Sequence, residues 1–256
     1  MNVLVTSGVV TAVVFLAGVV GLHLQRFLPA AHLSKETQDV IKLGTGMLSV
    51  LASLVLGLMI ASVKGSYDST SSAVRTYAAD LIVLDKTLQD YGDGAMAARR
   101  QLRDYTLHVL NDVWRSPRTH PFFEENREAG EMIARVWDAV RTLPVNGHDQ
   151  QVLAAQALEV ATSLLRQRWL LIERAGPSVQ PLVIVILVAW VAAIFLSFGI
   201  NGPRHATMYA VFLVLSLSVG TAILLVLEMD RAFEGYLRIS EKPMETALSH
   251  MLPEGP

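Results

Sequence analysis

The run from Leu43 to Val63 constrains this chain most strongly, because it contains no charged side chain. A helix of this length covers about 31 Å, which matches the hydrocarbon core of a bilayer. The run therefore predicts a membrane-spanning helix. Beyond Lys64-Gly65-Ser66 the pattern changes, and apolar residues recur in steps of three and four up to Tyr91-Gly92. This spacing is typical of a helix that packs one face against other helices in water.

Three further apolar runs, residues 3–24, 179–199 and 207–227, are long enough to cross a membrane. The first could instead be a cleaved signal peptide with Pro29-Ala30-Ala31 as its cleavage site, but it lacks a charged n-region and is longer than usual. The turn Asn201-Gly202-Pro203 joins the last two runs as a hairpin. The sequence thus predicts an all-α integral membrane protein with four transmembrane helices.

The stretch between the second and third spans predicts a helical domain in water. Charged residues make up 17% of the chain, too many for a protein that lies wholly within a membrane. Helical periodicity covers about 67–91, 94–114, 123–142 and 149–174, with Gly-, Pro- or Ser-containing breaks between these ranges. We therefore expect membrane helices in 1–63, a helical domain in 64–178, membrane helices in 179–227 and a polar tail in 228–256.

Several classes of function find no support in the sequence. The net charge of -2 does not favour nucleic-acid binding, and the absence of Cys excludes thiol chemistry and Cys-ligated metals. The seven histidines show no zinc-binding spacing, and no nucleophile elbow, phosphate loop or His-Glu-x-x-His motif occurs. The spans also lack the ionisable residues that mark coupled transport. We expect no enzyme, no cofactor and no metal site.

Basic residues near the ends of the spans predict the orientation. With four spans, both termini and the helical domain lie on the same side of the membrane. That side has twice as many Lys and Arg residues near the membrane, which favours a cytoplasmic location for it. They are Lys64, Arg75, Arg166, Arg168, Arg174, Arg231, Arg238 and Lys242, against Arg26, Lys35, Lys42 and Arg204 on the other side.

Small residues recur at every fourth position of the second span, at Ser49, Ser53, Gly57 and Ala61. Such a face lets helix backbones approach closely in lipid. One interpretation is ordinary packing against a neighbouring helix of the same subunit. The other is that the face meets its copies around a symmetry axis and lines a pore.

Two motifs resemble those of the uncharacterised bacterial bestrophin-like membrane proteins. The first follows the second span and reads Leu84-Asp85-Lys86-Thr87-Leu88-Gln89-Asp90-Tyr91-Gly92. The second follows the last span and reads Glu228-Met229-Asp230-Arg231-Ala232-Phe233-Glu234-Gly235, with Ala232 where the family usually has proline. The order of the spans and the size of the helical domain agree with the same family.

The resemblance implies a channel-like architecture, because bestrophins are pentameric ion channels whose second span lines the pore. It would place Ser49, Ser53 and Gly57 near the pore or at a subunit contact. It would also make an apolar constriction of Leu51, Leu54 and Leu58. The span contains no aromatic residue to narrow a pore as in typical bestrophins, and the chain has no contiguous acidic clasp for calcium.

The motif residues also have structural interpretations. Glu228 and Asp230 could bind a cation, but we interpret them as a membrane-interface anchor that pairs with Arg231, Arg168 or Arg174. Asp85 lies beside the apolar face, and Tyr91-Gly92 fits a helix end with glycine in a left-handed conformation.

We therefore hypothesise an oligomeric inner-membrane protein of bacterial type that passes small inorganic ions, with the lipid bilayer and its own copies as partners. The alternative is a non-conducting membrane scaffold or sensor whose helical domain binds a cytoplasmic partner.

Overall fold

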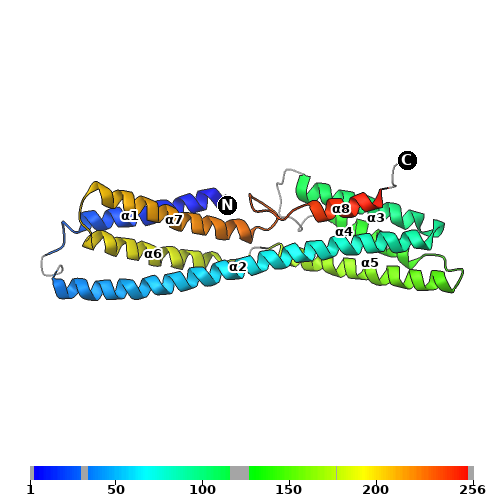
Figure 1. The fold of residues 1–256 in the computed structure, drawn as a ribbon, viewed down its shortest axis with the longest axis horizontal. Coiled ribbons are helices and arrows are strands. Elements are labelled where there is room, and N and C mark those ends of the chain that lie inside the picture. The colour runs from blue at the N-terminus through cyan, green and yellow to red at the C-terminus, as the bar shows by residue number, and fades with distance from the viewer. Residues whose placement is uncertain (1–2, 30–33, 116–126, 177, 253–256) are drawn as a thin grey trace. The chain divides into compact units, whose positions relative to one another are not determined.

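The computed structural model describes residues 3–29, 34–115, 127–176 and 178–252, and every regular element in these ranges is helical (Figure 1). The long helices are α1 (Val3–Leu24), α2 (Lys35–Tyr91), α5 (His148–Arg174), α6 (Pro181–Asn201) and α7 (Ala206–Asp230). The shorter ones are η2 (Asp93–Ala95), α3 (Met96–Leu110), the π-helical η3 (Asn111–Arg115), α4 (Arg127–Arg141) and α8 (Lys242–Met251). The predicted all-α fold is confirmed.

Within the described ranges, four helices are long and apolar enough to cross a membrane: α1, α2, α6 and α7. The apolar part of α2 is continuous with the amphipathic part, so the second predicted span and the first helix of the predicted domain form one helix. The predicted start of α4 and the break at Ser116 to Pro121 lie outside the described residues.

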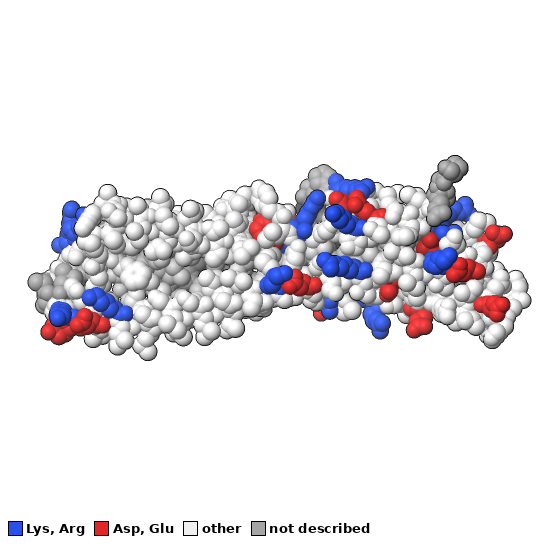
Figure 2. Space-filling model, in the orientation of Figure 1, with Lys and Arg blue, Asp and Glu red and all other residues white. Residues whose placement is uncertain are grey.

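The chain divides into two compact units. The membrane unit consists of the described residues up to Gly65 and from 178 to Asp230, and the helical unit of those from Ser66 to Gly176 and from Arg231 onward. On the face shown in Figure 2, charged side chains crowd the helical unit, whereas α1, α6 and α7 present a surface almost without charge.

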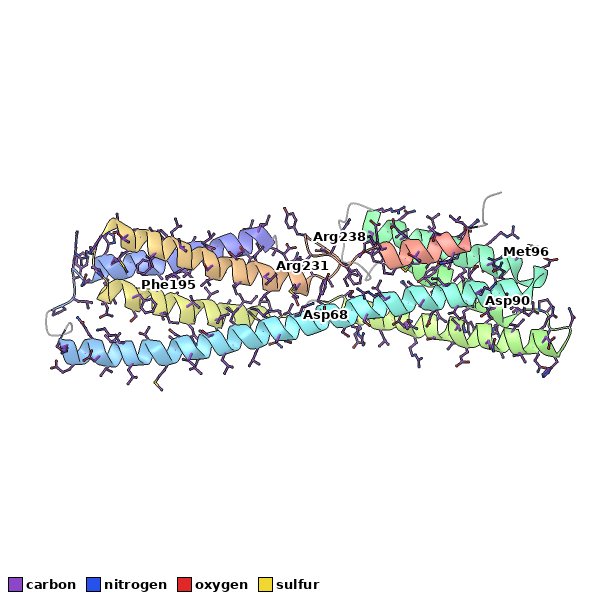
Figure 3. All side chains as sticks on the ribbon, in the orientation of Figure 1. Asp68, Asp90, Met96, Phe195, Arg231 and Arg238 are labelled. Atoms are coloured by element: carbon purple, nitrogen blue, oxygen red, sulfur yellow. The ribbon has the colours of Figure 1, made fainter. Side chains whose placement is uncertain are left out.

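The membrane unit is held together by very close helix contacts around α1. A Cβ atom on Gly199 of α6 would lie 2.7 Å from the amide nitrogen of Leu22 and 2.8 Å from Cα of Gly21. A Cβ on Gly18 would lie 2.9 Å from the ring of Phe212 in α7. Phe212 in turn packs against Phe195 of α6, with ring centroids 5.8 Å apart. Phe195 is labelled in Figure 3. Glycine is thus required where α1 meets its neighbours.

The helical unit has a core to which α2, α3, α4, α5 and α8 all contribute. The amphipathic part of α2 buries the apolar positions that its spacing predicts: Val74, Tyr77, Leu81, Leu84, Leu88 and Tyr91.

The segment after α7, for which the sequence predicted a polar tail, contributes buried apolar residues to this core. Phe233, Ile239 and Met244 are buried in it. The indole Nε1 of Trp114 donates a 2.8 Å hydrogen bond to the carbonyl of Ile239, and Arg115 forms an ion pair of 2.8 Å with Glu245. The apolar side chains of this short segment are buried because the segment packs against η3, which is distant in sequence.

Candidate functional site

The membrane part of α2 has one covered face and one uncovered face. Ala52, Met59 and Val63 are buried in the core of the membrane unit. On the other side, residues predicted to form a constriction remain open: Leu51, Leu54 and Leu58 are 50%, 57% and 63% exposed. One face of this helix therefore has no cover from the described part of its own chain.

The predicted small-residue face lies in two environments. Ser49 and Ser53 line a hollow of about 190 Å³ together with Leu187 and Val191 of α6. Gly57 and Ala61 are exposed, and apart from the adjacent backbone of α2 itself, no atom of the described residues lies within 4 Å of where a Cβ on Gly57 would be. Packing inside one subunit thus partly covers Ser49, whereas Ser53 borders the hollow but remains exposed, as do Gly57 and Ala61.

A second, more polar hollow of about 370 Å³ lies where α2 begins and α6 ends. The hydroxyls of Thr45 and Ser197 are 2.8 Å apart, and Asn201 Nδ2 donates to the Ser197 carbonyl at 2.8 Å. Lys42 and Ser49 also line this hollow. The sequence did not single out this group, because its members meet only when α2 pairs with α6. In the sequence, the hollow is indicated only by polar residues at the start of the second apolar run and at the end of the third.

Asp85 is buried and receives two hydrogen bonds from Arg99 of α3, each 2.9 Å long, from Nε and from Nη2. Hydrogen bonding to Asp85 raises the pKa of the Arg99 guanidinium, while burial opposes this shift. The carboxylate thereby joins α2 to α3. Arg99 is a residue that the sequence did not associate with this motif.

The rest of the first motif ends α2. Leu88 is fully buried, and the Tyr91 hydroxyl donates a hydrogen bond to the carbonyl of Pro144. Gly92 has φ of 93° and ψ of -155°. The positive φ agrees with the predicted glycine stop, although ψ places the residue in a more extended region that is almost exclusive to glycine.

The second motif fixes the chain where it leaves α7. Asp230 accepts hydrogen bonds from the amide and hydroxyl of Ser178, at 2.8 and 2.6 Å, and from the amide of Val179 at 3.1 Å. It therefore holds the start of the α6–α7 hairpin, where the sequence suggested an arginine partner. Glu228 is buried at the end of α7.

The last residues of that motif shape the turn into the helical unit's core. Phe233 meets Trp114 edge to face, with ring centroids 6.2 Å apart. Gly235 has a φ of 75°, a conformation that favours glycine. Within the described residues, no group of three or more His, Asp or Glu side chains could hold a metal ion.

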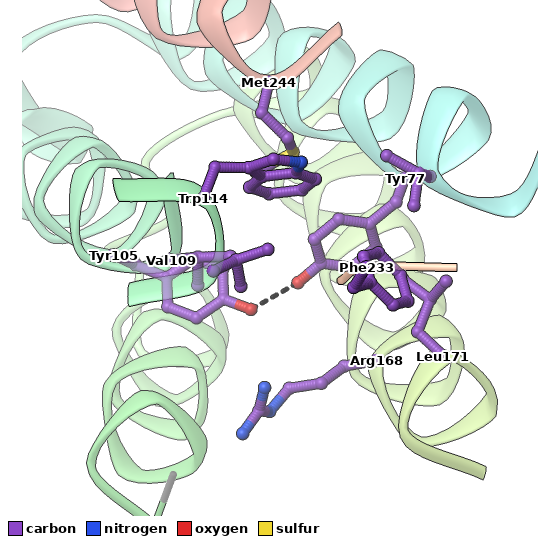
Figure 4. A pocket seen from close by; sticks show the side chains of 10 residues that line it. Tyr77, Tyr105, Val109, Trp114, Arg168, Leu171, Phe233 and Met244 are labelled. Atoms are coloured by element: carbon purple, nitrogen blue, oxygen red, sulfur yellow. Dashed lines mark hydrogen bonds between the residues drawn. The ribbon is translucent and has the colours of Figure 1, made fainter. Parts of the chain in front are cut away.

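A buried tyrosine pair in the helical unit was missed by the sequence analysis, since Tyr77 was interpreted only as an apolar position. Its hydroxyl lies 2.5 Å from that of Tyr105, beside a cavity of about 20 Å³ that Arg168 also lines (Figure 4). Burial raises the pKa of both phenols above the ordinary value, most strongly for Tyr77, and the charge of Arg168 opposes the shift. Both side chains are therefore neutral at physiological pH.

The family of the chain follows from its similarity to known proteins. A Bestrophin-like domain matches residues 12–244, which is most of the chain. The chain belongs to the Bestrophin-like family. No curated protein matches its sequence.

Solved structures share the fold. A variant of a bacterial bestrophin homologue from Klebsiella pneumoniae has a TM-score of 0.69 and 11% identity, over 98% of this chain and 97% of that one. Another structure of a Klebsiella pneumoniae bestrophin homologue has a TM-score of 0.65 and 12% identity, over 94% of this chain and 96% of that one. A structure described as a membrane protein has a TM-score of 0.66 and 12% identity, over 94% of this chain and 96% of that one. This Bestrophin-like chain is thus a multi-pass membrane protein with the bestrophin fold.

Proposed function

We propose that this Bestrophin-like protein assembles into an oligomer that conducts small ions through a pore lined by the membrane part of α2. One observation carries the proposal: α2 leaves an apolar face uncovered around Leu51, Leu54 and Leu58, with open space beside Gly57. A small residue there permits another helix to approach closely. Copies of α2 around a common axis would cover this face.

The composition of the spans supports a pore between subunits. Every residue from Leu43 to Val63 is uncharged, so a single copy offers no polar interior for an ion path. A ring of several copies can instead enclose water, with leucines that gate by dewetting at the narrowest point. Bestrophins, from which the family takes its name, are ion channels, and the shared fold makes the same use of α2 possible here.

The distribution of basic residues supports an inner-membrane location with both termini and the helical unit in the cytoplasm. Lys and Arg near the ends of the spans are twice as frequent on the side of the helical unit, as the positive-inside rule requires for a cytoplasmic side. A reporter fused at Gly94 should therefore be active only in the cytoplasm. Activity outside the cytoplasm would reverse the orientation.

The proposal is tested with the purified full chain in detergent and in planar bilayers. We expect a particle mass of several subunits and discrete conductance steps. A monomer without conductance would overturn the proposal and favour the alternative of a membrane scaffold or sensor. A stable oligomer without conductance would separate assembly from conduction and also count against a channel.

A further inference from the structure

We propose that the groove between α2 and α6 binds one anionic phospholipid, with its phosphate at Lys42 and an acyl chain beside Leu187 and Val191. This goes beyond the proposed pore, since it concerns the contact of each subunit with lipid and does not depend on conduction. The groove consists of the two hollows described above, which meet at Ser49.

The polar hollow offers the groups that a phosphate and its neighbouring hydroxyl require. Lys42 supplies a cation, although Asp39 lies 3.9 Å from its Nζ and offsets part of the charge. The Thr45 and Ser197 hydroxyls contact each other, so one of the two protons in this pair remains available for donation. The Ser49 hydroxyl cannot donate to a ligand as well, because it donates its proton to the Thr45 carbonyl at 2.8 Å.

Asn201 places an unsatisfied hydrogen-bond acceptor in the same hollow. Its Nδ2 donates to Ser197, whereas its Oδ1 is buried and has no hydrogen-bond partner in the described part of the chain. A buried acceptor without a donor is unfavourable, so a ligand hydroxyl at this point is favoured. The headgroup of phosphatidylglycerol carries both the anionic phosphate and hydroxyl donors, which meets both requirements.

The order of groups along α2 matches the order along a phospholipid. Lys42 immediately precedes the apolar run, which is the depth at which phosphates lie. Leu56, in the apolar hollow, is fourteen residues further on, or about 21 Å along the helix. This distance is close to a headgroup plus one leaflet of hydrocarbon. The apolar hollow is bounded by Ala52, Leu187 and Ile194, side chains that suit an acyl chain.

Charge on the surface agrees with this placement. In Figure 2 the visible face of the membrane unit is nearly free of charged side chains except at the end where α2 begins, where basic and acidic groups gather. The polar hollow opens at that end. Among the residues that line the polar hollow, Lys42 carries the positive charge, and a basic side chain within reach of the phosphate favours an anionic lipid over an uncharged one.

The test compares the thermal unfolding of the purified full chain in detergent with added phosphatidylglycerol, phosphatidylcholine or inorganic phosphate, and counts bound lipid by native mass spectrometry. We expect stabilisation and one retained lipid per subunit with phosphatidylglycerol alone. In Lys42→Gln, half-maximal stabilisation should require roughly fivefold more lipid. Lys35→Gln makes the same charge change at an exposed residue that does not line the groove, and should leave the lipid response unchanged.

A second variant tests the apolar half separately. Val191→Trp fills the hollow while retaining Lys42, and should abolish the retained lipid in protein that still elutes as the wild type. Equal protection by inorganic phosphate would show a free-anion site and overturn the lipid assignment. Equal protection by phosphatidylcholine, equal responses of Lys42→Gln and Lys35→Gln, or oligomers that retain no phosphatidylglycerol would overturn it as well.

Discussion

At the scale of single residues, the pair Asp85–Arg99 shows how a family motif residue acts as a structural contact. The carboxylate is buried, while the side chain of Arg99 is 29% exposed, so the pair is shielded from water mainly on one side. Removal of Arg99 leaves a buried carboxylate without its main partner, which is strongly unfavourable. We expect Arg99→Met to destabilise the protein by about 2–3 kcal/mol, somewhat less than for a fully buried pair.

The control is Arg100→Met, which removes the same charge from an exposed neighbour on α3. Thermal unfolding of both variants in one detergent measures the difference. Similar midpoints for the two variants would show that Asp85 does not need Arg99.

The Tyr77–Tyr105 pair gives a second prediction at this scale, in alkaline solution. Unfolded phenols release their protons near pH 10, whereas the raised pKa values keep the folded pair protonated to higher pH. Above about pH 10 the unfolded state therefore binds fewer protons, and stability falls as pH rises. Each buried phenol contributes a slope of at most about 1.4 kcal/mol per pH unit.

We expect the double variant Tyr77→Phe/Tyr105→Phe to lose less stability between pH 10 and 11 than the wild type. Tyr236→Phe serves as the control, since Tyr236 is 83% exposed. Unfolding midpoints measured across this range give the comparison. A double variant with the wild-type slope would contradict the assignment.

At the scale of elements, local patterns predicted where most of the helical sequence lies but not which helices pack together. The length of the uncharged runs indicates α1, α6, α7 and the membrane part of α2, because hydropathy and rise per residue are local properties. The apolar spacing of the rest of α2 also identified its buried face, including Leu81 and Leu84. Pairing between helices distant in sequence leaves no such signal. The Asp85–Arg99 contact, the Thr45–Ser197 contact and the packing of Ile239 against η3 therefore emerged only from the structure.

The glycines of the membrane unit illustrate this limit and yield a prediction. The sequence analysis singled out the small-residue spacing in α2, yet very close contacts with neighbouring backbone occur at Gly199 and Gly21, where α1 and α6 meet. Backbone atoms surround the position of a Cβ on Gly199, so a side chain there can fit only if the helices separate. Gly199→Val should cost about 3 kcal/mol and sharply reduce folded protein.

Gly8→Val provides the matched control on α1. Within the described structure, nothing lies within 4 Å of a Cβ at Gly8, so the same exchange should be tolerated. The yield of monodisperse protein after detergent extraction and its unfolding midpoint are the measurements. Comparable losses for the two variants would refute close packing at Gly199.

At the scale of the whole molecule, α2 is the element that both units share. Its membrane part contributes Ala52, Met59 and Val63 to one core, and its second part contributes Leu81, Leu84 and Leu88 to the other. A helix that belongs to two cores joins the two units through one continuous backbone. In the proposed oligomer, the uncovered face of α2 would carry such a connection to the pore.

The proposed assembly leads to a prediction at the same scale. Ser53 and Ser218 are both exposed serines on membrane helices of the single chain, but Ser53 lies on the small-residue face of α2 and Ser218 on α7. Ser53→Leu places a larger side chain where copies of α2 would approach, and close helix contact in lipid depends on small residues. We expect Ser53→Leu to lower the fraction of oligomer at least several-fold, with little effect from Ser218→Leu. Mass measurements in detergent and chemical cross-linking in membranes would follow this fraction. If the two exchanges had equal effects, the small-residue face would have no special part in assembly, and the pore would have to be sought on another helix.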